Sequence, residues 1–212
     1  MSQVAMTMRA YLDESDYALR NLISAVWQER HEVDALSAEL DALRRRVEDG
    51  YRRGEAIALN AEDADDVMLA ASAQWDTYFG DDKDAHEVAS KLDLINQRLA
   101  VREFSATTLS GALLQIGKQA ISIVHGQLSI APAGRLVGTQ SLKTVIWQGR
   151  NQALHWESGA FHPPVDECFH QLGPDFGAPF SQYKKRNMAF EIVRVLGWAS
   201  VEAVRNDLES LA

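Results

Sequence analysis

The sequence predicts an all-α fold, and three observations lead to that class. All five prolines follow residue 131, so none of them interrupts a long helix in the first part of the chain. Apolar residues recur at helical spacing in most segments between the turn-forming stretches. No segment has a convincing strand pattern, and the chain has no internal repeat. The apolar fraction of 46% is enough for a buried core, which argues against a wholly disordered chain.

The longest predicted helix covers residues 18–49. Apolar residues follow a heptad there, and only Glu29 interrupts it. Three arginines at 44–46 precede Gly50, and cations favour the C-terminus of a helix. The heptad predicts that this helix pairs with another, either inside one bundle or as a coiled coil with a partner. The heptad residues are Leu19, Leu22, Val26, Val33, Leu36, Leu40, Leu43 and Val47.

Shorter helices are predicted along the rest of the chain. The acidic run at 61–66 fits no calcium loop and is expected to open a helix ending near Phe79, because acids favour a helix N-terminus. Loops are predicted at 127–138 and at 173–179, where glycine and proline gather. The other predicted helices are two segments within 84–126, then 139–157, Pro163–Leu172, Ser181–Leu196 and Ser200–Leu211.

Charge divides the chain into two parts. Residues 1–105 carry 22 acidic and 12 basic side chains, whereas residues 106–212 carry 8 acidic and 9 basic ones. The overall charge of −9 argues against a broadly basic nucleic-acid surface, so any contact with a polyanion should be local and in the second half. We predict an acidic N-terminal helical arm over 1–83 and a helical bundle over 84–212.

Several classes of protein are disfavoured by what the chain lacks. Cys168 is the only cysteine, so an internal disulfide and a cysteine-rich metal cage are excluded. No apolar run approaches the length of about 20 residues that crosses a bilayer, and no signal-peptide pattern opens the sequence. We therefore expect no membrane association and a cytoplasmic location. No glycine-rich phosphate loop is present, and we expect no cofactor.

The most chemically specific segment is Arg150–His155. On a helical wheel of about 100° per residue, Arg150, Asn151 and His155 lie roughly 40°, 140° and 180° from Ile146, which should face the core. A forked, permanently charged arginine can hold phosphate oxygens and stabilise developing negative charge. A histidine can exchange protons with a ribose hydroxyl or a leaving oxygen. A cleavage that uses these two groups would need no metal.

An arginine, a polar neighbour and a histidine after four intervening residues, late in a helical domain, resemble the HEPN superfamily (higher eukaryotes and prokaryotes nucleotide-binding). The resemblance covers about residues 86–200 and implies a HEPN-type bundle, with the long N-terminal helix as an extension. It implies a metal-independent endoribonuclease in which the 2′-hydroxyl attacks phosphorus. Arg150 would bind the scissile phosphate, His155 would act in proton transfer and Asn151 would orient the cleft. Trp156 departs from the small residue that often follows the histidine.

The resemblance also implies partners. Many members of the superfamily are homodimers in which two copies of the motif line one composite cleft, and they recur as toxins and antiphage-defence effectors. We expect an RNA substrate, a homodimer, and an antitoxin or defence-system partner protein. The alternative is a non-catalytic helical dimerisation or nucleotide-binding module that acts through protein–protein contacts, for which the 18–49 helix is suited.

Two further groups of residues were considered. Basic residues near the Ser181 helix start, where the helix dipole disfavours cations, suggest contact with an RNA backbone, although a solvated charged face explains them too. With an aromatic stacking residue they form the predicted RNA-binding set, Lys143, Trp147, Lys184, Lys185 and Arg186. His155, His162, Cys168 and His170, with Asp166, match no common zinc spacing, so no metal site is predicted.

Overall fold

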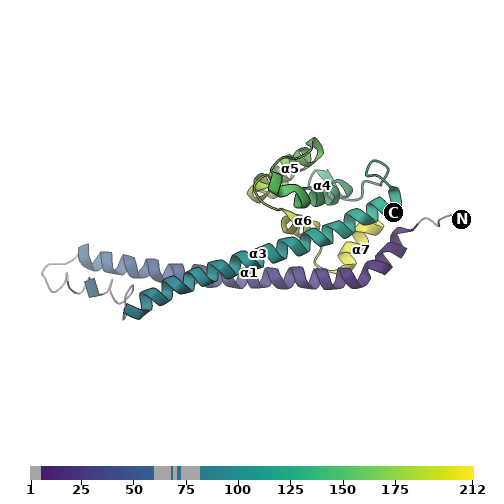
Figure 1. Cartoon of the computed structure of the whole chain (residues 1–212). Helices are drawn as coiled ribbons and strands as arrows, with labels where there is room; N and C mark the ends of the chain where they lie inside the picture. The colour runs from purple at the N-terminus through teal and green to yellow at the C-terminus, as the bar shows by residue number, and fades with distance from the viewer. Residues whose placement is uncertain (1–5, 60–67, 69–70, 73–81) are drawn as a thin grey trace. The chain divides into compact units, whose positions relative to one another are not determined.

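The computed structural model describes residues 6–59, 68, 71–72 and 82–212, and these are mostly helical (Figure 1). The all-α class is confirmed, with one small hairpin as the only sheet in the described part of the chain. No helix among the described residues is long and apolar enough to cross a membrane. The α-helices are α1 (Met8–Leu59), α3 (Asp82–His125), α4 (Leu142–His155), α5 (Pro163–Phe176), α6 (Ala189–Leu196) and α7 (Val201–Glu209).

The chain forms two compact units. Unit 1 comprises Met1–Glu29 together with Phe104–Ala212, and unit 2 comprises Arg30–Glu103. The two long helices, α1 and α3, each contribute one part to either unit. The expected division at 83/84 differs from this grouping, because the first residues of α1 belong with the C-terminal half of the chain.

Unit 2 contains a helix pair. Leu36 and Leu40 of α1 are buried with Ile95 of α3, and Leu43, Leu92 and Leu99 flank them. Lys91 Nζ lies 3.2 Å from Glu39 Oε1 on the exposed side of the pair. The predicted 18–49 helix is part of a longer one, and its heptad residues lie on the buried side wherever their burial is described. The helix predicted from 61 to 79 lies almost wholly outside the described residues.

Unit 1 has a much larger core. Leu12 and Leu19 from α1 and Leu113 from α3 are fully buried, as are Phe169 and Trp198 from the C-terminal part. The indole N–H of Trp27 donates to the carbonyl of Trp198 at 3.0 Å, which ties α1 to the segment between α6 and α7. The part of α1 that belongs to unit 1, up to Glu29, therefore lies in the same core that supports α4 to α7.

A partly buried polar network closes unit 1 at its C-terminal end. Arg135 donates to both carboxylate oxygens of Asp207, at 2.6 and 2.8 Å, and to the carbonyl of Leu196 at 2.7 Å. The indole N–H of Trp198 donates to the same carboxylate at 2.9 Å. Hydrogen bonding to Asp207 raises the pKa of Arg135. Arg135 is thus a structural residue and is not free to contribute to a basic patch.

The loop before α4 contains a short hairpin that the sequence did not indicate. β1 (Leu136–Val137) pairs antiparallel with β2 (Gln140–Ser141). Gly138 has a φ of +61° at the turn, and an added Cβ would lie 2.3 Å from the Asp175 carboxylate. Thr139 donates to that carboxylate through its backbone N–H at 2.7 Å and its hydroxyl at 2.8 Å. The hairpin is therefore anchored to the end of α5.

Two predicted helix boundaries were wrong. α5 continues through Gly173 and Pro174 to Phe176, and the N–H of Gly177 donates to the carbonyl of Gly173 at 2.8 Å, so helical hydrogen bonding continues past the proline. No helix opens at Ser181: a 3₁₀ turn (Ala178–Gln182) is followed by irregular backbone, and α6 begins only at Ala189. Two carbonyls and one N–H of this stretch bind the side chain of Gln152 of α4, as described below.

Candidate functional site

α4 carries the Arg150–His155 motif and is packed into unit 1 by one face. Its buried residues are Leu142, Val145, Ile146, Gln148, Gly149 and Gln152. The backbone approaches α6 closely at Gly149, where an added Cβ would lie 3.0 Å from Ile192. Trp156 begins a 3₁₀ turn (Trp156–Ser158), so the regular wheel ends there and Trp156 is only half-buried.

Gln152 fixes α4 against the irregular stretch before α6. Its side chain is fully buried, and its Nε2 donates to the carbonyls of Tyr183 and Arg186, both at 2.7 Å. Its Oε1 accepts from the backbone N–H of Met188 at 2.9 Å. These bonds satisfy backbone groups that a helix would otherwise satisfy, which explains why α6 starts late. The wheel predicted an apolar inner face and missed this residue.

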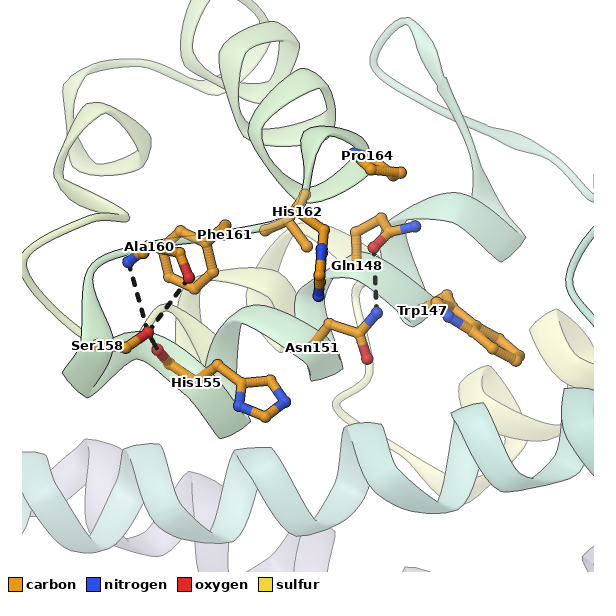
Figure 2. A pocket seen from close by; sticks show the side chains of 10 residues that line it. Trp147, Gln148, Asn151, His155, Ser158, Ala160, Phe161, His162 and Pro164 are labelled. Atoms are coloured by element: carbon orange, nitrogen blue, oxygen red, sulfur yellow. Dashed lines mark hydrogen bonds between the residues drawn. The ribbon is translucent and has the colours of Figure 1, made fainter.

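A pocket of about 380 Å³ lies beside α4 (Figure 2). Ten residues line it, from α4, from the 3₁₀ turn and connection that follow, and from the start of α5. They are Trp147, Gln148, Asn151, His155, Ser158, Ala160, Phe161, His162, Pro164 and Val165. The volume lies in the range of small-ligand sites.

Asn151 and His155 therefore face one pocket. Asn151 Nδ2 donates to Gln148 Oε1 at 3.2 Å, which orients the amide along the pocket wall (Figure 2). The imidazole of His155 is exposed and has no hydrogen-bond partner among the described residues. Both its nitrogens are thus available for exchanging a proton with a ligand.

Arg150 does not line the pocket but lies next to a residue that does. Its Nε donates to Gln115 Oε1 of α3, and its Nη1 lies 3.4 Å from Asn151 Oδ1. Its Nη2 has no hydrogen-bond partner in the part of the chain that the structure describes. The guanidinium is held in place by α3 while retaining N–H groups that can bind an anion.

A second cation lies near the pocket wall. Lys118 Nζ of α3 lies 4.5 Å from the ring centre of Trp147, which lines the pocket. A cation over an indole face is an attractive arrangement. Lys118 was not predicted from the sequence. It lies three residues after Gln115, the partner of Arg150, and residues three apart share one side of a helix.

His162 is a pocket residue that the sequence did not predict. In the sequence it belongs to a different element from His155, and its spacing fits no zinc site. The structure brings the two histidines to one pocket: the 3₁₀ turn ends at Gly159, whose φ of +62° reverses the chain back across α4. Figure 2 shows the His162 ring extending into the pocket from the segment before α5.

The other candidate metal ligands do not join this pair. Among the described residues, no group of three or more His, Cys, Asp or Glu side chains is arranged to hold a metal ion. Cys168 is buried in the core, and burial raises the pKa of its thiol to about 12. The thiol is therefore neither a nucleophile nor a metal ligand at neutral pH.

The predicted RNA-binding residues lie in different places. Trp147 lines the pocket, whereas Lys143 donates to the carbonyl of Ala131 at 2.5 Å. Lys184, Lys185 and Arg186 lie in the irregular stretch before α6, so the argument from an unfavourable helix dipole does not apply to them. Whether these four cations contact RNA stays a prediction.

Two of those cations already have acidic partners. Lys184 Nζ lies 3.3 Å from Asp166 Oδ1, and Arg186 pairs with Glu191. The hydrogen bond to Asp166 raises the pKa of Lys184, and the Tyr183 hydroxyl, donating at 2.6 Å, lowers the pKa of Asp166. Lys185 is exposed.

No family model, curated protein or solved structure matches this chain. Function must therefore be inferred from the chemistry of the pocket. The pocket combines an indole, two carboxamides and two imidazoles, and two cations lie at its α3 side. Such a set can stack an unpaired base, hold a phosphate and move protons.

Proposed function

We propose that the chain is a metal-independent endoribonuclease that cleaves RNA by attack of a ribose 2′-hydroxyl on the adjacent phosphorus. The observation that carries the proposal is that Asn151 and His155 line one pocket while Arg150 lies against Asn151. Two residues of the motif thus line a space in the size range of small-ligand sites, and the third lies directly behind Asn151.

Arg150 would bind the scissile phosphate. In-line attack builds negative charge on the phosphoryl oxygens, and preorganised cationic donors stabilise that charge most effectively. Gln115 already fixes the Nε of Arg150, so little side-chain freedom is lost when the remaining N–H groups bind oxygen. Lys118, over the ring of Trp147, would add a second positive charge near the same side.

His155 would exchange the proton that the reaction requires. Its exposure and its lack of a partner among the described residues support this role, since an imidazole satisfied by backbone would have to break that bond first. Asn151 would orient the substrate, because its amide is held by Gln148 at 3.2 Å. Trp147 would stack an unpaired base, which favours single-stranded RNA over duplex.

The proposal includes assembly and biological setting, both of which follow from the resemblance. A homodimer would bring two copies of the motif to a composite cleft. The protein would act in the cytoplasm as a toxin or defence effector, restrained by an antitoxin or a defence-system partner. The exposed apolar side chain of Leu154, beside His155, is consistent with a surface that a second copy covers.

A second candidate is a non-catalytic helical interaction protein. Leu94 and Val101 of α3, seven residues apart in unit 2, are 54% and 67% exposed. Apolar residues at this spacing share one helix face and favour pairing with another helix. This second function does not depend on the pocket residues, so variants of the pocket should bind partners as the wild type does.

The test is cleavage of mixed single-stranded RNA by the full chain in the presence of a chelator. We expect Arg150→Ala and His155→Ala each to reduce the rate by about 100-fold or more, the effect of removing a charge-stabilising or proton-transfer group. Matched controls are Arg194→Ala and His31→Ala, which alter exposed residues that do not line the pocket and should leave the rate unchanged. Equal cleavage by the wild type and both pocket variants would contradict the proposal.

A further inference from the structure

The pocket contains two imidazoles that the motif alone would not bring together. His155 ends α4, and His162 precedes α5, yet both line the same pocket. In Figure 2 the two rings extend into this space from different walls, with Asn151 between them in the view. Neither ring has a hydrogen-bond partner among the described residues, so neither is committed to a structural bond.

His162 is held at the pocket by its backbone. Pro163 and Pro164 follow it, and a residue before proline is restricted to extended conformations, as its φ of −68° and ψ of 149° show. Its carbonyl accepts from the N–H of Val165 at 2.9 Å, which begins α5. Its side chain makes no capping bond to the helix. The position is therefore rigid while the imidazole remains free.

Cleavage by a 2′-hydroxyl needs two proton transfers. The 2′-oxygen loses a proton as it forms a bond to phosphorus, and the 5′-oxygen gains a proton as its bond to phosphorus breaks. A single imidazole would have to perform both transfers in succession. Two imidazoles, one neutral and one protonated, can perform both transfers in a single catalytic step. The products are a 2′,3′-cyclic phosphate and a free 5′-hydroxyl.

On this basis we propose that His162 is a second catalytic residue and that it divides the two proton transfers with His155. One imidazole accepts the proton of the 2′-hydroxyl, and the other, entering as imidazolium, gives its proton to the 5′-oxygen. The pair exchanges these protons with water before the next cycle, so the proton count balances. This inference rests on the proposed ribonuclease function and adds to it a residue outside the Arg150–His155 motif.

The residues around the pocket also limit the class of RNA that can be the substrate. Both imidazoles, the amides of Gln148 and Asn151 and the indole of Trp147 surround one space of about 380 Å³. The proposal places one unpaired nucleotide with its flanking phosphate in this space, because the indole of Trp147 can stack a base only when that base is not paired.

The experiment compares two substrates that differ in the leaving group. Each is a DNA oligonucleotide with a single central ribonucleotide, and in one the 5′-bridging oxygen next to it is replaced by sulfur. A leaving thiolate needs no proton, so loss of the residue that protonates the 5′-oxygen no longer slows the reaction. His155→Ala and His162→Ala are measured on both, with His162→Gln as a second variant and His170→Ala, an exposed α5 residue, as control.

We expect His155→Ala and His162→Ala each to slow cleavage of the oxygen substrate by about 100-fold or more, with unchanged melting temperatures. On the sulfur substrate, one of the two variants should return to within about tenfold of the wild-type rate and the other should not. His162→Gln should follow His162→Ala, because its amide cannot transfer a proton at this step. A merely structural role for His162 would instead be restored by His162→Gln, which keeps a polar side chain at this position but cannot transfer the proton.

The outcomes separate this inference from the function on which it rests. Failure of the wild type to cleave either substrate would overturn the proposed function. Cleavage that requires His155 but is unaffected by His162→Ala would overturn only the role of His162. Rescue of both variants by sulfur, or of neither, would overturn the division of the two proton transfers between them.

Discussion

Units 1 and 2 share two helices but differ in how those helices are buried. In unit 1, α1 and α3 are covered by α4 to α7, and large side chains such as Phe169, Phe180 and Trp198 are completely buried. In unit 2 the same two helices pack against each other through a cluster centred on Leu36, Leu40 and Ile95. Unit 1 thus provides the many-sided support that a pocket requires, and unit 2 provides a helix surface.

The largest difference between the units should appear when a core leucine is shortened. Leu113 of unit 1 is completely buried, and Leu113→Ala should reduce the free energy of unfolding by about 3 to 4 kcal/mol. Leu40 of unit 2 is buried mainly by one neighbouring helix, and Leu40→Ala should cost about half as much. Urea denaturation followed by circular dichroism measures both. Equal losses would contradict the comparison.

A buried carboxamide should be almost as important as a core leucine. Gln152→Leu keeps the volume but leaves two carbonyls and one N–H without partners, and should cost about 3 kcal/mol. The matched control is Gln97→Leu in unit 2, an exposed site where the change should stay within about 0.5 kcal/mol. A small effect of Gln152→Leu would mean that the stretch before α6 is not held by α4.

Ion pairs in the two units should contribute differently to the free energy of unfolding. Asp207→Asn removes the partner of Arg135 in unit 1 and weakens the bond from Trp198, and should cost about 2 kcal/mol. Glu39→Gln removes the exposed pair with Lys91 in unit 2, and should cost about 0.5 kcal/mol or less. Denaturation at low and high salt checks this, because salt should weaken a pair of two exposed side chains more than a pair in which the carboxylate is nearly buried.

The smallest expected effect concerns alkaline pH. Burial raises the pKa of Cys168 to about 12, so the folded chain keeps the thiol proton where the unfolded chain, with a pKa near 8.5, loses it. The stabilisation is therefore complete below about pH 8.5 and is lost as pH rises. Between pH 7.5 and pH 9.5, the free energy of unfolding should fall by about 1 kcal/mol more in the wild type than in Cys168→Ala. Urea denaturation at the two pH values measures this difference.

Thiol labelling gives an independent check of the same site. Cys168 should react with an alkylating reagent only when unit 1 unfolds, since the side chain is 1% exposed. In a Leu40→Cys variant the second thiol should react faster than Cys168, because unit 2 opens at lower cost. Faster reaction at Cys168 than at the introduced cysteine would contradict the expectation that unit 2 opens at lower cost than unit 1.

Much of the fold could be predicted from local patterns, and the division into units could not. The placement of the prolines and the heptad predicted long helices correctly. The heptad is interrupted only at Glu29, however, and its buried residues belong to two clusters: Leu19 and Val26 lie in the core of unit 1, whereas Leu36 and Leu40 lie in unit 2. The spacing of apolar residues shows which face of a helix is buried, but it does not show which segment covers that face.

The site was predictable to the same extent. The spacing from Arg150 to His155 could be read from the sequence because all of these residues lie on one helix. His162 reaches the pocket through a chain reversal at Gly159, and α6 starts late because Gln152 binds the backbone of Tyr183 and Arg186. Both effects arise from contacts between segments distant in sequence, which no local period contains.

The most direct test of the central claim is the chemistry of the RNA ends. A defined single-stranded RNA is incubated with the full chain and a chelator, and the product ends are identified by mass spectrometry. The pocket in unit 1 predicts 2′,3′-cyclic phosphate and 5′-hydroxyl ends, formed by the wild type and by Glu39→Gln of unit 2 but not by His155→Ala. Ends bearing a 5′-phosphate, or the same products at the same rate from His155→Ala, would contradict it.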